Sequence, residues 1–156
     1  MPEASYGGRR AAFIENNDLR VTVLKEGGHI AEILDKRSSV SPLWVPPWPS
    51  IEPSTYDPQK YPEYGAGSDA KLLAGIMGHN LCLDIFGGPS DEEFAAGITP
   101  HGEGSVVPYE ISETDGQLTM QAHLRLAQIH GGCRPKAELK WSTMQSFEEP
   151  IRSLSL

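Results

Sequence analysis

Two pairs of short segments, each joined by a turn that contains glycine, constrain the fold of this chain most. In residues 19–35, apolar and polar side chains alternate up to the turn Lys25-Glu26-Gly27-Gly28, and a β-rich stretch follows it. The segments 106–113 and 118–126 flank Asp115-Gly116, a dipeptide that supplies the positive φ angles of a tight hairpin. Alternation with a period of two is typical of strands that bury one face. The sequence therefore predicts two antiparallel hairpins.

The density of turn-forming residues supports an all-β class. The chain has 156 residues, of which 16 are glycine and 13 are proline. That share lies well above the roughly 12% of average usage, and it indicates many turns rather than long helices. The length fits one domain of ordinary size with a core of its own.

The segment 42–62 differs in character from the hairpins. It holds seven of the 13 prolines, together with Trp44, Trp48, Tyr56 and Tyr61. Proline cannot donate to a sheet ladder, and aromatic rings are unfavourable to leave in water. We expect an ordered loop that packs its rings against the sheet. The alternative is a platform on which a sugar stacks, with Trp48 among the substrate contacts.

The candidate chemistry lies in the glycine-rich segment 75–104. We expect a buried strand at Leu81–Phe86 and a helical turn at Asp91–Ala96. His79-Asn80 precedes this strand, and His101-Gly102-Glu103 follows the helical turn. An imidazole near its usual pKa can give or take a proton at pH 7, and a neighbouring glycine leaves room for a ligand. Glu103 can orient or charge the ring of His101, so these residues form the candidate site.

Two other interpretations of these residues stay open. The histidines can be structural groups with satisfied hydrogen bonds. Alternatively, a small cupin-like metal site can use the ligand set His79, Cys82, His101 and Glu103, although this spacing is unspecific. The sequence contains neither a phosphate-binding glycine loop nor a G-x-S-x-G motif, so nucleotide hydrolysis and acyl transfer lack their signatures.

The remaining histidines carry no predicted role. His29 follows a Gly-Gly turn and is expected at the surface or at a sheet edge. His123 is expected on the polar face of its strand, whose other face carries Leu118, Met120, Ala122, Leu124 and Leu126.

Charge excludes several classes of partner. The chain carries 13 basic and 21 acidic residues, for a net charge of −8, and residues 72–124 contain no lysine or arginine. Nucleic acids and anionic membrane surfaces are therefore not expected partners. No apolar run approaches the roughly 20 residues of a membrane helix, and the N-terminus lacks a secretory pattern, so we expect a cytoplasmic protein. In that compartment Cys82 and Cys133 would stay unpaired.

Three stretches together resemble a known family. They are ENNDLRVTVLKEGGHIAEILDKRSSVSPLW, HNLCLDIFGGPS and GITPHGEGSVVPYEIS. Residues 12–128 resemble the N-terminal half of the aldose 1-epimerase (galactose mutarotase-like) family. The resemblance implies an antiparallel β-sandwich that binds a sugar in a cleft, with a histidine pair and a carboxylate base that interconvert its anomers. His101 matches the histidine of the family's HG motif and is the implied catalytic residue.

Among the site residues, the resemblance supplies only His101, and the residues themselves suggest the other contacts. The expected sugar contacts are His79, Asn80, Glu103 and Trp48, with no cofactor. Several relatives continue the HG motif into an arginine where this chain has Ser105, so a neutral hexose-like sugar is expected rather than a sugar phosphate.

Family members are much longer than this chain, and their second histidine and base lie in the half that it lacks. We therefore expect a truncated or frame-shifted form, inactive as an isomerase. Its residues 1–128 would belong to the β-sandwich domain, and residues 129–156 would form an irregular tail. An incomplete sandwich leaves sheet uncovered, which favours self-association. The rival interpretation is a non-catalytic β-sandwich that serves as a binding or structural domain.

Overall fold

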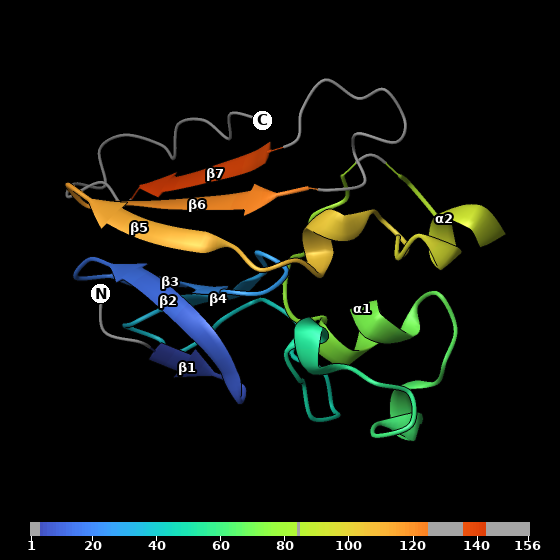
Figure 1. Ribbon diagram of the computed structural model, residues 1–156. Coiled ribbons are helices and arrows are strands. Elements are labelled where there is room, and N and C mark those ends of the chain that lie inside the picture. The colour runs from blue at the N-terminus through green and yellow to red at the C-terminus, as the bar shows by residue number, and fades with distance from the viewer. Residues whose placement is uncertain (1–3, 84, 125–135, 143–156) are drawn as a thin grey trace.

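The chain folds into two antiparallel sheets stacked face to face, with helical turns and loops to one side (Figure 1). The computed structural model describes residues 4–83, 85–124 and 136–142. In the first sheet, the strands follow the chain in the order β1 (Ala4–Tyr6), β2 (Arg9–Glu15), β3 (Leu19–Leu24) and β4 (Ile30–Asp35). In the second sheet, the order is β5 (Glu110–Thr114), β6 (Gln117–His123) and β7 (Lys136–Ser142). The predicted all-β antiparallel sandwich is confirmed.

Both predicted hairpins are present. β3 pairs with β4 across the Gly27-Gly28 turn, and β5 pairs with β6 across Asp115-Gly116. Asp115 and Gly116 have φ angles of 51° and 71°, as a type I′ turn requires. β5 starts only at Glu110, because the preceding residues form a turn of 3₁₀ helix and the loop after it.

The main core lies between the two sheets. β6 contributes its apolar alternate residues, and β2 and β3 face it with theirs. The buried members of this core are Ala12, Ile14, Val23, Leu81, Tyr109, Leu118, Met120, Ala122 and Leu124. Leu126 lies outside the described residues. Because burial of each large side chain contributes about 1.5–3 kcal/mol, this interface is the principal source of stability.

Polar side chains of β3 and β4 bond to one another on the face of the first sheet opposite the main core. Arg20 and Thr22 on β3 both donate to the carboxylate of Glu32 on β4, at 2.9 and 2.8 Å. The guanidinium of Arg20 also lies 6.0 Å from the ring centroid of Phe13 on β2. Cross-strand contacts of this kind stabilise the pairing of β3 with β4.

The segment 129–156 was expected to be irregular, and for residues 136–142 this expectation is wrong. These residues form β7, which pairs antiparallel with β6 and places Ala137, Leu139 and Trp141 opposite Ala122, Met120 and Leu118. The pairing satisfies backbone groups of β6 that would otherwise form an open edge. The division of the chain into residues 1–128 and a tail stays a prediction, and Cys133 lies outside the described residues.

The described part of the connection between the sheets contains five short helical elements. They are η1 (Pro53–Thr55), η2 (Pro62–Tyr64), α1 (Ala70–Gly75), α2 (Asp91–Ala95) and η3 (Glu103–Ser105). The helical turn predicted at Asp91–Ala96 is confirmed, and Ser90 and Glu93 form a capping box at its start. No helix among the described residues has the length and apolar character needed to cross a membrane.

A strand was predicted at Leu81–Phe86, but the described residues of this segment, 81–83 and 85–86, form none. Leu81 is buried, but Cys82 is exposed and the side chain of Phe86 is 92% exposed. The backbone of Leu83 donates to the carbonyl of His101 at 2.9 Å, so this segment pairs with a turn rather than with a strand. The apolar run that suggested a buried strand is therefore a loop, which is buried at Leu81 and exposed at Phe86.

Candidate functional site

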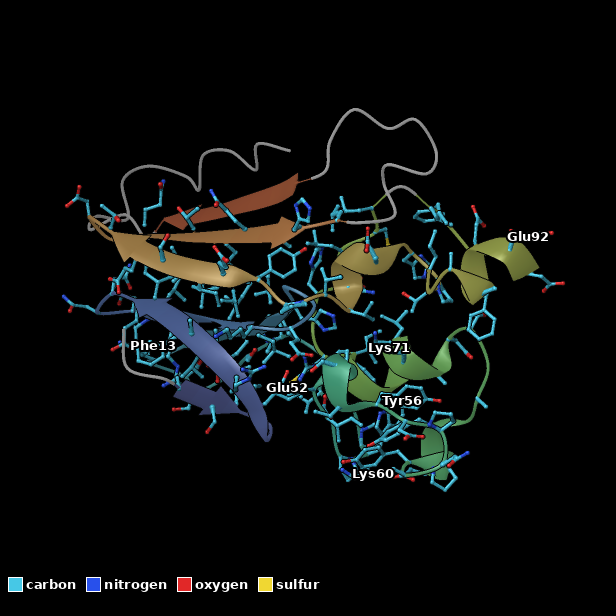
Figure 2. All side chains as sticks on the ribbon, viewed as in Figure 1. Phe13, Glu52, Tyr56, Lys60, Lys71 and Glu92 are labelled. Carbon is cyan, nitrogen blue, oxygen red and sulfur yellow. The ribbon has the colours of Figure 1, made fainter. Side chains whose placement is uncertain are left out.

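A network of buried charges attaches the proline-rich segment to the first sheet. Arg9 on β2 is fully buried, and its guanidinium donates to the carbonyls of Gly75 and Glu26 and to the carboxylate of Glu52. Figure 2 shows Glu52 where the first sheet meets the connection. The buried carboxylate of Glu26 accepts from Ser54 Oγ at 2.7 Å and from the Ser54 backbone N–H at 2.7 Å. This network fixes η1 beside the turn that joins β3 and β4.

His29 joins three segments at the same turn. Its Nε2 donates to the carbonyl of Ser105 at 3.0 Å, and its Nδ1 accepts from the backbone N–H of Met77 at 3.2 Å. Burial, reinforced by the charge of Arg9, lowers the pKa of His29 from 6.5 to about 4. The expectation of an exposed or edge histidine is therefore wrong: the ring is buried, and it is neutral at pH 7.

These attachments leave a cleft of about 990 Å³ beside η3 and the end of β6. Its apolar wall comes from the loop that follows η3. Its polar side chains come from β5 and β6, from η1, α1 and η3, and from the turn after β3. The residues that line it are Lys25, Ser54, Lys71, Ala96, Gly97, Glu103, Val106, Val107, Pro108, Tyr109, Glu110, Gln121, Ala122 and His123. The cleft has the volume of a typical small-molecule site.

The cleft combines two carboxylates, two lysines and hydroxyl groups. Glu103 is buried at the start of η3, whereas Glu110 and His123 are exposed. Burial raises the pKa of Tyr109, and its hydroxyl donates to the carbonyl of Gly104 at 3.1 Å. The phenol therefore stays protonated, while the other polar groups can donate to or accept from a ligand rich in hydroxyls.

The structure places His101 next to this cleft but not in its lining. His101 has a φ angle of 67°, and its ring packs edge-on against Phe86 with centroids 5.8 Å apart. Its Nδ1 atom is buried and has no hydrogen-bond partner among the described residues. Gly102 has a φ angle of 84°, and a Cβ atom there would collide with the carbonyl of Leu83. The HG motif thus packs against the loop that contains Leu83, and Glu103 follows it into the cleft wall.

The other predicted contacts lie elsewhere. His79 is exposed and forms an isolated β-bridge with Ile30, and Asn80 is half-buried beside it. Trp48 is partly exposed, packs edge-on against Trp44 at 5.6 Å and donates from Nε1 to the carbonyl of Leu73. Of the predicted site residues, only Glu103 lines the cleft.

The cupin-like alternative does not assemble. Within residues 4–83, 85–124 and 136–142, no three side chains from His, Cys, Asp and Glu lie close enough to hold a metal ion. His79, Cys82, His101 and Glu103 therefore do not form a metal site.

Sequence reasoning missed most of the polar lining of the cleft. Lys25 and Lys71 lie outside the segment 72–124, and His123 was assigned no role. The alternation along β6 correctly placed His123 and Gln121 on the polar face, but no local pattern indicates which loop lies beside that face.

Comparison with known proteins supports the fold. No protein-family model matches the chain, and no curated protein is similar to it in sequence. Among solved structures, a galactose mutarotase-like protein from Lactobacillus casei ATCC 334 superposes with a TM-score of 0.51 at 11% identity. The superposition covers 85% of this chain and 39% of that one. The fold is galactose mutarotase-like.

The present chain therefore matches about two fifths of the length of that neighbour. A 4-alpha-glucanotransferase from Thermococcus litoralis also superposes, with a TM-score of 0.38 at 15% identity over 74% of this chain and 18% of that one. That second likeness is too weak to support an inference. Membership of the aldose 1-epimerase family remains a prediction, since the fold alone is shared.

Proposed function

We propose that this chain binds a hexose-sized carbohydrate in the cleft beside η3. The observation that carries the proposal is the lining itself. Val106, Val107 and Pro108 form an apolar wall, and buried Glu103 lies among several side chains that can bond to hydroxyl groups. Carbohydrate sites need such a combination, because a sugar presents both apolar C–H faces and many hydroxyls. The galactose mutarotase-like fold agrees with this ligand class, and a neutral hexose is the simplest ligand to test.

Within this proposal, Glu103 contacts the sugar directly and His101 acts from the adjoining turn. His101 remains the residue to test for proton transfer, since its buried Nδ1 lacks a partner among the described residues and lies two positions before Glu103. His79, Asn80 and Trp48 stay predicted contacts of lower rank, because they do not line the cleft. Self-association also stays a prediction.

Titration with glucose and galactose tests the binding proposal. We expect the backbone amide NMR signals of Gly97, Val106 and Val107 to shift in a saturable manner. Replacing Gln121 with alanine should weaken binding about tenfold, the effect of losing one hydrogen bond to a ligand. Thr119 lies on the same face of β6 but outside the cleft, so Thr119→Ala serves as the matched control. If no signal shifts up to the solubility limit of the sugars, the chain is a structural domain without a sugar site.

We also propose that the chain does not measurably accelerate the interconversion of sugar anomers. General acid–base catalysis by a positioned group contributes about 10² to 10⁴ in rate, and it needs an acid and a base on opposite sides of the reacting atoms. His101 and Glu103 belong to one turn and do not face each other across the cleft.

Polarimetry of freshly dissolved α-glucose and α-galactose should therefore give the spontaneous rate. Three variants, His101→Ala, Glu103→Gln and His123→Gln, should give that same rate. An acceleration by the unmodified chain that any of these variants abolishes would contradict the proposed inactivity and identify the group responsible.

A further inference from the structure

Among the lysine and arginine side chains that the structure describes, those of residues 4–83, only two have no partner, and both lie in the cleft. Lys25 directly follows β3, and Lys71 lies on α1, where Figure 2 labels it. Both side chains line the cleft and are half-buried. Neither makes a hydrogen bond or an ion pair with any described residue.

Every other basic side chain that the structure describes is engaged. Lys60 lies 5.0 Å from the ring centroid of Tyr61. The remaining five form ion pairs with carboxylates: Arg9, Arg10, Arg20, Lys36 and Arg37. In a chain with a net charge of −8, carboxylates that could pair with Lys25 and Lys71 are abundant. Two ammonium groups in one cleft, neither paired with a described carboxylate, therefore indicate that the cleft is built to take a negative charge.

We propose that the preferred ligand of the cleft is a hexose that carries one carboxylate, that is, a hexuronic acid. The inference rests on the proposed carbohydrate site and specifies its ligand class. Lys25 and Lys71 bind the carboxylate, while Glu103 and Gln121 bind hydroxyl groups. The neutral sugar expected from the sequence rested on the absence of cations in residues 72–124, and the fold brings both lysines to the cleft from outside that segment.

The remaining charges of the cleft favour a carboxylate over a phosphate. Glu103 and Glu110 line the same space, so a dianionic phosphate would meet more repulsion than a monoanionic carboxylate. No arginine lies among the lining residues that the structure describes, and arginine is the side chain that recognises phosphate through two parallel hydrogen bonds. Lysine acts as a point charge and suits a ligand whose hydroxyl groups supply the specificity.

Calorimetric titration at low ionic strength tests this inference. Glucuronate and galacturonate should bind at least tenfold more tightly than glucose and galactose. The preference should shrink as salt is added, because salt screens the attraction between exposed charges. Lys71→Gln should reduce the ratio of uronate to hexose affinity to about one. Lys60→Gln removes a charge away from the cleft and should leave that ratio as it is.

The possible outcomes distinguish a failure of the hexuronic acid inference from a failure of the proposed carbohydrate site. Equal binding of hexoses and uronates would overturn the inference while the carbohydrate site stands. Tighter binding of glucose 6-phosphate than of either uronate would overturn the carboxylate assignment. Binding of acetate as strong as that of a uronate would show an anion site that ignores the sugar. If neither hexoses nor uronates bind, the carbohydrate site itself is wrong and the inference fails with it.

Discussion

Replacing Arg9 with leucine should lower the free energy of unfolding by about 4 kcal/mol. The guanidinium has no exposed surface, and it donates to the carbonyls of Gly75 and Glu26 as well as to Glu52. Leucine fills much of the space but leaves these acceptors without their donor. Removing one partner of a buried charge network is therefore far more damaging than losing an exposed ion pair. Urea unfolding followed by circular dichroism measures the difference.

Arg37→Leu is the matched control for this substitution. Arg37 is 72% exposed and pairs with Asp18 and Asp35 at the surface. Because water already solvates these charges, we expect a loss below about 0.5 kcal/mol. Equal losses for the two variants would show that the buried network contributes nothing beyond surface electrostatics.

Acidification should destabilise the fold through His29. The unfolded chain takes up a proton at this imidazole below pH 6.5, whereas the folded chain resists protonation until about pH 4. The unfolded state thus binds more protons in this interval, so stability falls as the pH falls. The contribution of His29 is complete above pH 6.5, and about 3 kcal/mol of it is lost by pH 4.

Carboxylates also titrate near pH 4, so the effect of His29 must be isolated with variants. His29→Gln removes the titrating group, and its free energy of unfolding should vary less steeply than that of the unmodified chain between pH 6.5 and pH 4. His123 is exposed, and His123→Gln should retain the original slope. A slope for His29→Gln equal to that of the unmodified chain would contradict the buried, neutral imidazole.

Elements that depend on local sequence were predictable. The Asp115-Gly116 turn and the alternation from Leu118 to Leu124 are enough to define β5 and β6, because turn type and burial of one face fix the register. β2 was missed for the opposite reason. Arg9 and Ala11 are buried on one face and Ala12 and Ile14 on the other, so no alternation marks the strand.

The candidate site depends on contacts between distant segments, and sequence reasoning recovered little of it. His29 follows a Gly-Gly turn, which usually indicates exposure, yet Met77 and Ser105 cover it from loops far along the chain. Glu103 was identified because it adjoins a recognisable histidine motif. No local sequence pattern marks Lys25 and Lys71 as site residues. Their proposed role depends on where the fold places them, in one cleft and without a described carboxylate as partner.

The two hairpin turns of this protein differ in what they tolerate. Asp115-Gly116 is exposed, so a label or an inserted peptide there would project into solvent. The turn at residues 25–29 has a similar glycine content, but Gly27 donates to the carbonyl of Val107, and Tyr109 donates to that of Lys25. An insertion at this turn would break these two hydrogen bonds, which join the turn after β3 to the loop before β5. It would also displace Lys25 from the cleft. Protein engineering of this chain should therefore use the Asp115-Gly116 turn as its attachment point.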